Sequence, residues 1–238
     1  MLKLNKLYQM DCMAGMPHFP DNYFDLAIID PPYGGGRGHS GKNRSGYAVQ
    51  KNGSKLYVVS PFYKDKDWDN APPDAAYFDE LFRVSRHQII WGINYMPENF
   101  GPGRIVWDKC NRGSAQSDCE IAYNSLTRRV DLFRYMWRGF MQGRNEFEGH
   151  IQQGNKKLNE KRIHPTQKPV ALYRWLLRNY AKPGDKILDT HAGSASSFLA
   201  AYELGFNYVG FEIDEEYHAA ASARVDEYMA AISMGKGG

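Results

Sequence analysis

Short apolar runs recur along the chain and predict the strands of a sheet. The run from Leu26 to Asp30 shows no alternation of polarity, which is typical of a strand buried on both faces of a parallel sheet. Pro31 and Pro32 lack a backbone N–H, so we expect this strand to end at Asp30. Further strands are predicted over residues 4–11, 87–92, 103–107, 119–123, 130–135, 186–189 and 208–211.

Apolar residues at helical spacing lie between these strands. A helix is expected from Asp74 to Val84, with an inner face made of Tyr77, Phe78, Leu81 and Phe82. A second helix follows Pro169 and carries an apolar stripe of Leu172, Trp175, Leu176 and Tyr180. A third ends at Leu204, where Gly205 can terminate it. This alternation predicts an α/β fold with a Rossmann-like, doubly wound, mostly parallel sheet of about seven strands.

The composition narrows the class of protein. With 238 residues, of which 42% are apolar, the chain is expected to form one domain over residues 1–238. Its three cysteines are odd in number and form no CxxC pair, so neither a disulfide framework nor a zinc site is predicted. No stretch approaches a membrane span or a signal peptide. We therefore expect a cytoplasmic protein with no metal and no membrane contact.

The net charge of +3 is only mildly basic, so binding to nucleic acid would depend on local patches. The interval 34–56 is rich in Gly, Ser and Asn and is expected to be a mobile loop in the free protein. Its cations could bind DNA phosphates: Arg37, Lys42, Arg44, Lys51 and Lys55. A second irregular interval, 138–163, mixes basic and acidic residues.

The groups at the end of the strand at Asp30 suit one kind of chemistry. The exocyclic amino group of adenine or cytosine is a poor nucleophile because its lone pair is delocalised into the ring. The Asp30 carboxylate and the Pro31 carbonyl could accept both amino hydrogens and free that lone pair, while Tyr33 stacks on the base. Pro32 cannot extend the strand, which leaves these groups at its tip. The pattern points to methylation of a nucleobase amino group.

The last third of the chain predicts a nucleotide-type ligand. A strand ends at Asp189, a turn of small residues leads into a helix, and a second strand ends at Glu212. In this arrangement the backbone of the turn approaches a ligand closely and the acid binds ribose hydroxyls. The candidate cofactor residues here are Asp189, His191, Gly193, Ser194, Ser196 and Glu212.

These segments resemble one known family. Asp30-Pro31-Pro32-Tyr33 resembles the catalytic motif of the S-adenosylmethionine-dependent DNA amino-methyltransferases, and its aspartate-led form is similar to the adenine-N6 branch. The segment from Asp189 to Ser196 resembles the family's S-adenosylmethionine motif, with Ala195 at its second glycine.

The segment from His164 to Pro169 also closely matches a family segment, the one that grips the methionine carboxylate. That likeness implies that Thr166, Gln167 and Lys168 bind the cofactor. Asp11 lies where family members have an aspartate that contacts the target base; by position alone it could equally be a helix N-cap. The catalytic strand precedes the cofactor strand, which is similar to the β class, a circular permutation of the usual methyltransferase order.

The resemblance implies an enzyme, of a small phage-like branch, that methylates N6 of a flipped-out adenine in double-stranded DNA with S-adenosylmethionine. It also implies that 138–163 is a short target-recognition insertion, and it is compatible with a homodimer and with a restriction-modification role. Two alternatives stay open: methylation of cytosine N4, which uses the same geometry, and a degenerate nucleic-acid-binding relative without activity.

Overall fold

The computed structural model describes residues 1–34, 46–49, 53–58, 71–110, 117–138, 141–143 and 159–235. The chain forms two compact units. The first comprises residues 1–31 and 73–238, and the second comprises residues 32–72. Each unit is described by itself.

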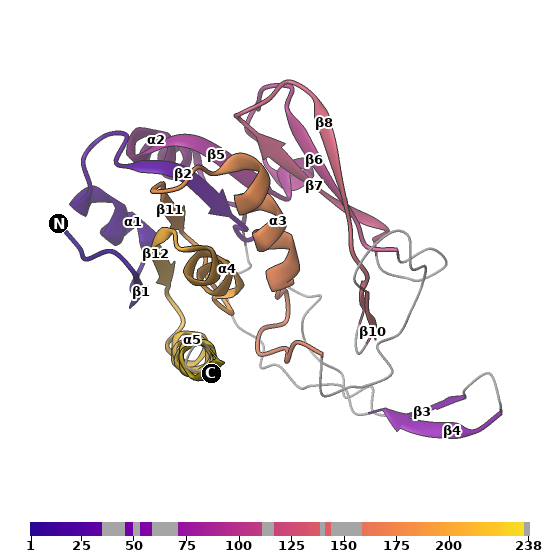
Figure 1. Cartoon of the computed structure of the whole chain (residues 1–238). Helices are drawn as coiled ribbons and strands as arrows, with labels where there is room; N and C mark the ends of the chain where they lie inside the picture. The colour runs from indigo at the N-terminus through magenta and orange to yellow at the C-terminus, as the bar shows by residue number, and fades with distance from the viewer. Residues whose placement is uncertain are drawn as a thin grey trace. The chain divides into compact units, whose positions relative to one another are not determined.

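Within the described residues, the first unit contains an eight-stranded sheet in the order β1-β12-β11-β2-β5-β7-β6-β8 (Figure 1). The strands are β1 (Lys6–Gln9), β2 (Phe24–Ile29), β5 (Ser85–Trp91), β6 (Arg104–Asp108), β7 (Cys119–Asn124), β8 (Val130–Arg134), β11 (Lys186–Asp189) and β12 (Asn207–Glu212). The five strands from β1 to β5 in this order are parallel, β7 is antiparallel to both its neighbours, and β8 is parallel to β6. The predicted mostly parallel α/β sheet is confirmed, with eight strands rather than about seven.

The predicted order of the chain through the sheet is also confirmed. β2, from the start of the chain, lies beside β11, from its last third, with Ile187 opposite Leu26. β2 is covered on both faces, since Leu26 and Ile28 are each 1% exposed and Ala27 and Ile29 are fully buried. A strand in this central position needs apolar residues throughout, which explains its unbroken apolar run.

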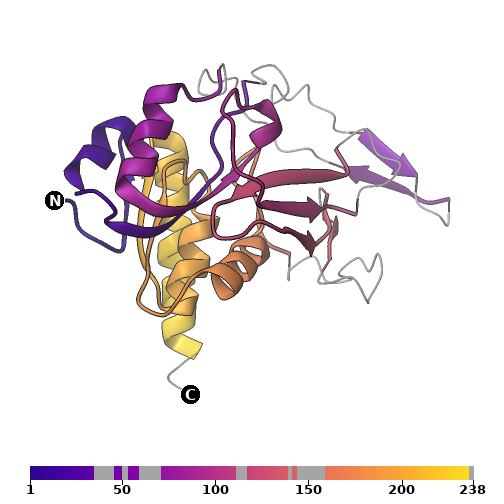
Figure 2. The same cartoon turned by 90° about the horizontal axis from the view of Figure 1, so that it is seen from above.

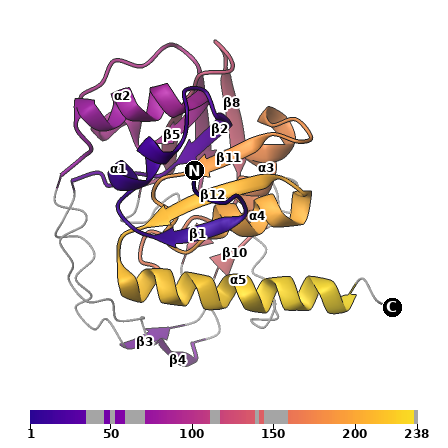
Figure 3. The same cartoon turned by 90° about the vertical axis from the view of Figure 1, so that its left-hand side faces the viewer.

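Helices cover both faces of the sheet (Figure 2). They are α1 (Cys12–Gly15), α2 (Ala75–Val84), α3 (Val170–Tyr180), α4 (Ser196–Leu204) and α5 (Glu215–Gly235), with short 3₁₀ turns η1 (Met16–His18) and η3 (Ile93–Tyr95). α2 packs on β5 and η1, whereas α4 packs on α3 and β12, and α5 lies along β1 and β12. α1 and α2 thus lie on one side of the sheet and α3 and α4 on the other, whereas α5 runs along the sheet edge at β1 (Figure 3). No helix in the described parts of the chain is long and apolar enough to cross a membrane.

α2 begins where the sequence predicts, but its inner face differs from the prediction. The Asp74 carboxylate accepts a hydrogen bond from the Tyr77 N–H at 3.0 Å, which caps the helix. Phe82 was expected to be buried, and this was wrong: its side chain is 42% exposed, and Val84 is buried instead. Phe82 follows the buried Leu81 by one residue, a rotation of about 100°, which turns it off the buried stripe.

The second unit contains a hairpin within the interval expected to be a loop. β3 (Gly46–Val49) pairs antiparallel with β4 (Lys55–Val58), with Val49 opposite Lys55. These residues thus have regular structure, and the mobility expected for the interval 34–56 stays a prediction. The signal was present in the sequence, because Asn52-Gly53 between two segments rich in aromatic and β-branched residues is typical of a hairpin. A second short hairpin, in the first unit, joins β9 (Trp137–Arg138) to β10 (Met141–Gln142).

Candidate active site at the carboxyl ends of the parallel strands

The carboxyl ends of the parallel strands gather acidic residues at one edge of the sheet. β1, β12, β11 and β2 run side by side and end on the same side (Figure 3). Asp11 follows β1, Glu212 and Asp189 end β12 and β11, and Asp30 follows β2. The edge of an open α/β sheet is the usual place for ligands, and this one carries concentrated negative charge suited to a cationic ligand.

Asp30 is held by a buried ion-pair network. Its Oδ1 lies 2.7 Å from the Lys168 ammonium, which lies 2.7 Å from Oε2 of Glu120. The other carboxylate oxygen of Glu120 binds Lys109. Lys168 precedes α3, Glu120 is on β7 and Lys109 follows β6, so three separate parts of the chain converge on the tip of β2.

The charges of this network reinforce one another. Burial alone would lower the pKa of Lys168, but the neighbouring carboxylates of Asp30 and Glu120 outweigh it and raise that pKa. Burial alone would raise the pKa of Glu120, but Lys168 and Lys109 bring it down to about 2. Both groups therefore stay charged at neutral pH.

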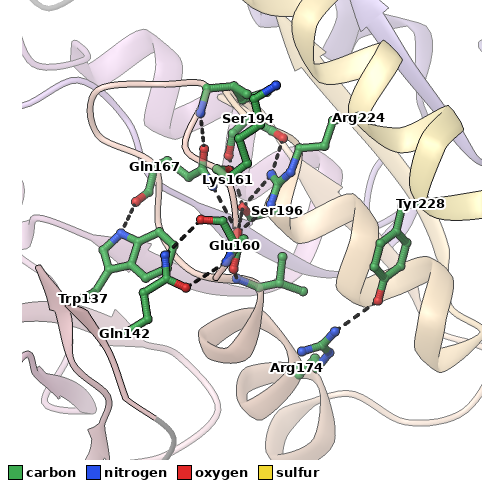
Figure 4. Close-up of polar contacts among 12 residues, drawn as sticks. Trp137, Gln142, Glu160, Lys161, Gln167, Arg174, Ser194, Ser196, Arg224 and Tyr228 are labelled. Atoms are coloured by element: carbon green, nitrogen blue, oxygen red, sulfur yellow. Dashed lines mark hydrogen bonds and ion pairs between the residues drawn. The ribbon is translucent and has the colours of Figure 1, made fainter. Parts of the chain in front are cut away.

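The N-terminus of α3 follows the segment that resembles the family's carboxylate-binding segment, and Glu160 occupies it (Figure 4). Its Oε2 accepts from the Val170 N–H at 3.1 Å, and its Oε1 accepts from Arg224 at 2.5 Å and from Gln167 at 3.1 Å. The backbone of Glu160 also bonds to both ends of the Gln142 amide, at 2.9 Å each. An internal carboxylate thus occupies the positive helix end.

The residues of the segment from His164 to Pro169 mainly contact the chain itself. The Gln167 amide accepts from the Ile163 N–H at 2.9 Å and donates to the Lys161 carbonyl at 3.1 Å. The Thr166 hydroxyl lies 3.1 Å from Nδ1 of the buried His164. The cofactor-binding roles of Thr166, Gln167 and Lys168 stay predictions, and for Gln167 these contacts favour a structural role.

The turn between β11 and α4 has the geometry of a close ligand approach. Gly193 and Ala195 both have a left-handed backbone, with φ of 50° and 58°. For Ala195 this costs about 1 kcal/mol, which explains why glycine is favoured at this place in the related motif. The Gly193 N–H donates to the Glu212 carboxylate at 2.9 Å, so the turn and the acid at the end of β12 are tied together. Ser194 and Ser196 face inward, where their hydroxyls lie 3.1 Å apart.

Asp189 and His191 lie in the same turn and have oppositely shifted pKa values. Burial raises the pKa of Asp189 to about 7, although the Ser197 hydroxyl and the His191 N–H bond to its carboxylate and counteract this rise. Burial lowers the pKa of His191 to about 4, a fall that nearby Asp11 partly offsets. The imidazole is therefore neutral at pH 7, and its Nδ1 lies 2.9 Å from the Thr190 hydroxyl.

The remaining predicted residues are placed as follows. Asp11 caps α1, since its carboxylate accepts from the Met13 N–H at 2.8 Å; the N-cap interpretation is confirmed, and its contact with a base stays a prediction.

Pro31 is buried at the end of β2, whereas Pro32 and Tyr33 belong to the second unit and are half-buried there. Lys55 is exposed at the start of β4. Four predicted DNA-contacting cations lie outside the described residues: Arg37, Lys42, Arg44 and Lys51.

Sequence reasoning missed several residues of this region. Glu120 and Lys109 were not predicted as site residues, because nothing local indicated that they would join the ion-pair network of Lys168 and Asp30. Glu160 lay in an interval interpreted as target recognition, yet it caps α3. A cavity of about 850 Å³ lies elsewhere, among β8, α3 and α5, and none of the predicted site residues lines it.

Comparison with known proteins points to one family. A family model described as DNA methylase, N6_N4_Mtase, matches residues 112–223. Over these residues the chain is similar to the N6/N4 DNA methylases. The likeness supports a DNA methyltransferase that uses S-adenosylmethionine.

Individual relatives match nearly the whole chain. It is 24% identical to Escherichia coli (strain K12) YubD over 246 residues, which are 98% of this chain and 95% of that one. It is also 24% identical to the type II methyltransferase M.HinfI of Haemophilus influenzae, over 94% of this chain and 69% of that one.

Two solved structures share its fold. The M1.HpyAVI–SAM complex matches with a TM-score of 0.52 at 18% identity, over 92% of this chain and 98% of that one. The cytosine-N4-specific PvuII DNA methyltransferase matches with a TM-score of 0.52 at 14% identity, over 93% and 86% of the two chains. The methyltransferase fold predicted from the sequence is thereby confirmed.

Proposed function

We propose that this protein transfers the methyl group of S-adenosylmethionine to the N6 amino group of an adenine flipped out of double-stranded DNA. The observation that carries the proposal is the place of Asp30. It follows β2, directly beside the strand β11 that leads into the cofactor turn, and it is ion-paired with Lys168 at 2.7 Å. The group that would bind the amino nitrogen and the turn that would bind the cofactor thus lie on neighbouring strands.

The chain's own groups suit the reaction at the amino nitrogen. The Asp30 carboxylate and the Pro31 carbonyl would accept the two amino hydrogens and draw the nitrogen towards tetrahedral geometry. Tyr33 would stack on the extruded base, whose removal from the duplex costs a few kcal/mol. Asp11, at the same sheet edge, would assist in holding the base. Much of the rate acceleration would come from alignment of two bound reactants.

The observed cofactor region fits S-adenosylmethionine. When bound, this cofactor supplies an electrophilic methyl group on a positively charged sulfur. The acidic sheet edge favours that charge, and the left-handed backbone at Gly193 and Ala195 permits close approach. Glu212 is 9% exposed and already accepts N–H groups from Gly193 and Asp214, which fixes its carboxylate for ribose hydroxyls.

The choice of adenine rests on the aspartate that begins the catalytic motif. Cytosine-N4 methylation is a second candidate, because the cytosine-N4-specific PvuII enzyme shares the fold. The name of M.HinfI as a type II methyltransferase supports a modification role at a specific DNA site.

A nucleoside digest of methylated DNA tests the proposal. Unmethylated duplex DNA is incubated with the protein and S-adenosylmethionine, and the digest is analysed by mass spectrometry. We expect N6-methyladenine from the wild type and none from Asp30→Ala, because the acceptor for the amino hydrogens is lost. Glu203→Gln removes an acid of the Arg174–Glu203 pair between α3 and α4 and should keep full activity.

Each other result would revise the proposal in a defined way. N4-methylcytosine would keep the mechanism and correct the base. No methylated base, on double or single strands, would contradict the proposal and favour a nucleic-acid-binding relative without activity.

A further inference from the structure

Two residues with no proposed part at the amino nitrogen form a row of charges with the reactive carboxylate: Lys168 contacts Asp30, and Glu120 contacts Lys168. Lys168 comes from the segment before α3 and Glu120 from β7, yet the ammonium lies 2.7 Å from an oxygen of each of Asp30 and Glu120. Lys109 binds the second oxygen of Glu120. Charges therefore alternate along the row Asp30, Lys168, Glu120, Lys109.

Burial makes this row rigid. The Lys168 side chain is 4% exposed, and that of Asp30 is 14% exposed. An ammonium so deeply buried would be costly without its partners, so it is held between the two carboxylates. Its nitrogen also lies 5.5 Å from the centre of the fully buried Trp91 ring, which restricts movement on another side. Lys168, which is itself held in place by Glu120 and the Trp91 ring, therefore restrains the Asp30 carboxylate.

Each charge in the row has a consequence for Asp30. Only an ionised carboxylate accepts hydrogen bonds at both oxygens without donating one. Without Lys168, Asp30 would lose the ammonium 2.7 Å from its carboxylate and would take up a proton more readily. Without Glu120, Asp30 would be the remaining carboxylate of this row beside the Lys168 ammonium. The ammonium would then pair more strongly with Asp30, and this would weaken Asp30 as an acceptor for the amino hydrogens.

We propose that Lys168 and Glu120 are positioning residues for methyl transfer: Lys168 orients Asp30 and keeps it ionised, and Glu120 holds Lys168 in place. This inference rests on the proposed function and assigns Lys168 to the base side of the site rather than to the cofactor carboxylate. The raised pKa of Lys168, in which the carboxylates of Asp30 and Glu120 outweigh burial, supports a permanently charged ammonium.

Kinetics and cofactor affinity, measured separately, test the inference. In Lys168→Gln and Glu120→Gln we expect kcat to fall, by about 100-fold for Lys168→Gln, because Asp30 is misplaced. Titration should show that S-adenosylmethionine affinity is unchanged in both. Glu212→Gln is the matched comparison, since it should weaken cofactor affinity, and Glu203→Gln should change neither quantity.

The pH profile of kcat separates positioning from mere stability. Among the described residues, the charged or titratable groups near Asp30 include Lys168 before α3, Glu120 on β7, Asp189 on β11 and Tyr173 on α3. Removal of the one cation among them in Lys168→Gln should move the acid limb of the profile to higher pH. A purely structural role would lower the folded fraction and leave the limb in place.

The outcomes distinguish this inference from the function on which it rests. If the wild type methylates no base, both fail. If the wild type is active and Lys168→Gln keeps its kcat, or loses cofactor affinity as Glu212→Gln does, only the inference fails. Should a single variant not fold, the double variant Lys168→Gln with Glu120→Gln replaces the ion pair by two amides that can hydrogen-bond. A folded double variant with the kcat of the wild type would likewise overturn the inference.

Discussion

At the scale of single residues, position in the sheet decides the charge that a side chain carries. Asp189 and His191 are two residues apart at the end of β11, where Asp189 is buried and His191 is half-buried. Burial favours the neutral form of each, which raises the pKa of Asp189 to about 7 and lowers that of His191 to about 4. The turn between β11 and α4, where we propose that the cofactor binds, is thus less charged than its sequence suggests.

The His191→Phe variant should be less sensitive to acid than the wild type. The pKa of His191 falls from 6.5 to about 4 on folding, so its contribution to stability is present above pH 6.5 and is lost as the pH falls towards 4. Between pH 7 and pH 5 the free energy of unfolding should therefore fall by about 2 kcal/mol less in the variant. Urea titrations at both pH values measure this difference.

Asp189 and the other acids titrate in both proteins, so their contributions cancel in that comparison. Equal losses of stability in wild type and variant would show that His191 is not the group responsible.

At the scale of elements, α3 shows a helix end stabilised from a distance. Its N-cap residue, Pro169, provides no side-chain hydrogen bond, and Glu160 supplies the carboxylate instead. Arg224 of α5 pairs with that carboxylate at 2.5 Å and also donates to the Ser194 carbonyl at 2.7 Å. One acid therefore joins α3, α5 and the turn before α4.

Glu160→Gln should destabilise the protein more than Glu203→Gln does. Arg224 is 13% exposed in its side chain, and burial lowers its pKa despite the adjacent Glu160. Loss of the acid would leave this guanidinium without its partner in the pair, at a cost of about 2 kcal/mol in the free energy of unfolding. The Arg174–Glu203 pair is more exposed, at 33% and 29%, so Glu203→Gln should cost about 0.5 kcal/mol.

Urea unfolding of the two variants gives both values under the same conditions. Similar losses would contradict a special role for Glu160 at the α3 N-terminus.

At the scale of the whole molecule, charged residues are unevenly distributed. The net charge is +3, yet the strand edge that would bind the cofactor carries Asp11, Asp30 and Glu212. Attraction for DNA phosphates must then come from other parts of the chain. The basic residues of the interval 34–56 are the first candidates.

Replacement of Arg37, Lys42 and Arg44 by Ala should make DNA binding less dependent on salt. Each lost phosphate contact should reduce the slope of log K against log salt by about 0.9. Binding titrations over a series of salt concentrations measure this slope. A matched triple variant at Lys3, Arg128 and Lys182, all exposed in the first unit, removes the same charge. An equal change of slope in both triple variants would point to overall charge rather than to this interval.

The features that the sequence determined by itself are those encoded by neighbouring residues. The end of β2 at Asp30 follows from two prolines, the cap of α2 from Asp74, and the cofactor turn from small residues between a strand and a helix. The sequence did not predict which strands would be neighbours, and the pairing of Ile187 with Leu26 shows that the late strand β11 lies beside β2. Where sequence reasoning failed locally, as at the hairpin around Asn52-Gly53, the signal was present and was not used.

The tertiary structure alone decided which distant side chains meet. Lys168 was expected at a cofactor carboxylate, and it pairs with Asp30 and Glu120; the helix end expected to bind that carboxylate holds Glu160. These contacts join segments that lie far apart in the sequence, and no local pattern of apolar or capping residues encodes them. They depend on which strands are neighbours in the sheet, since strand order brings β7 and the segment before α3 to the tip of β2.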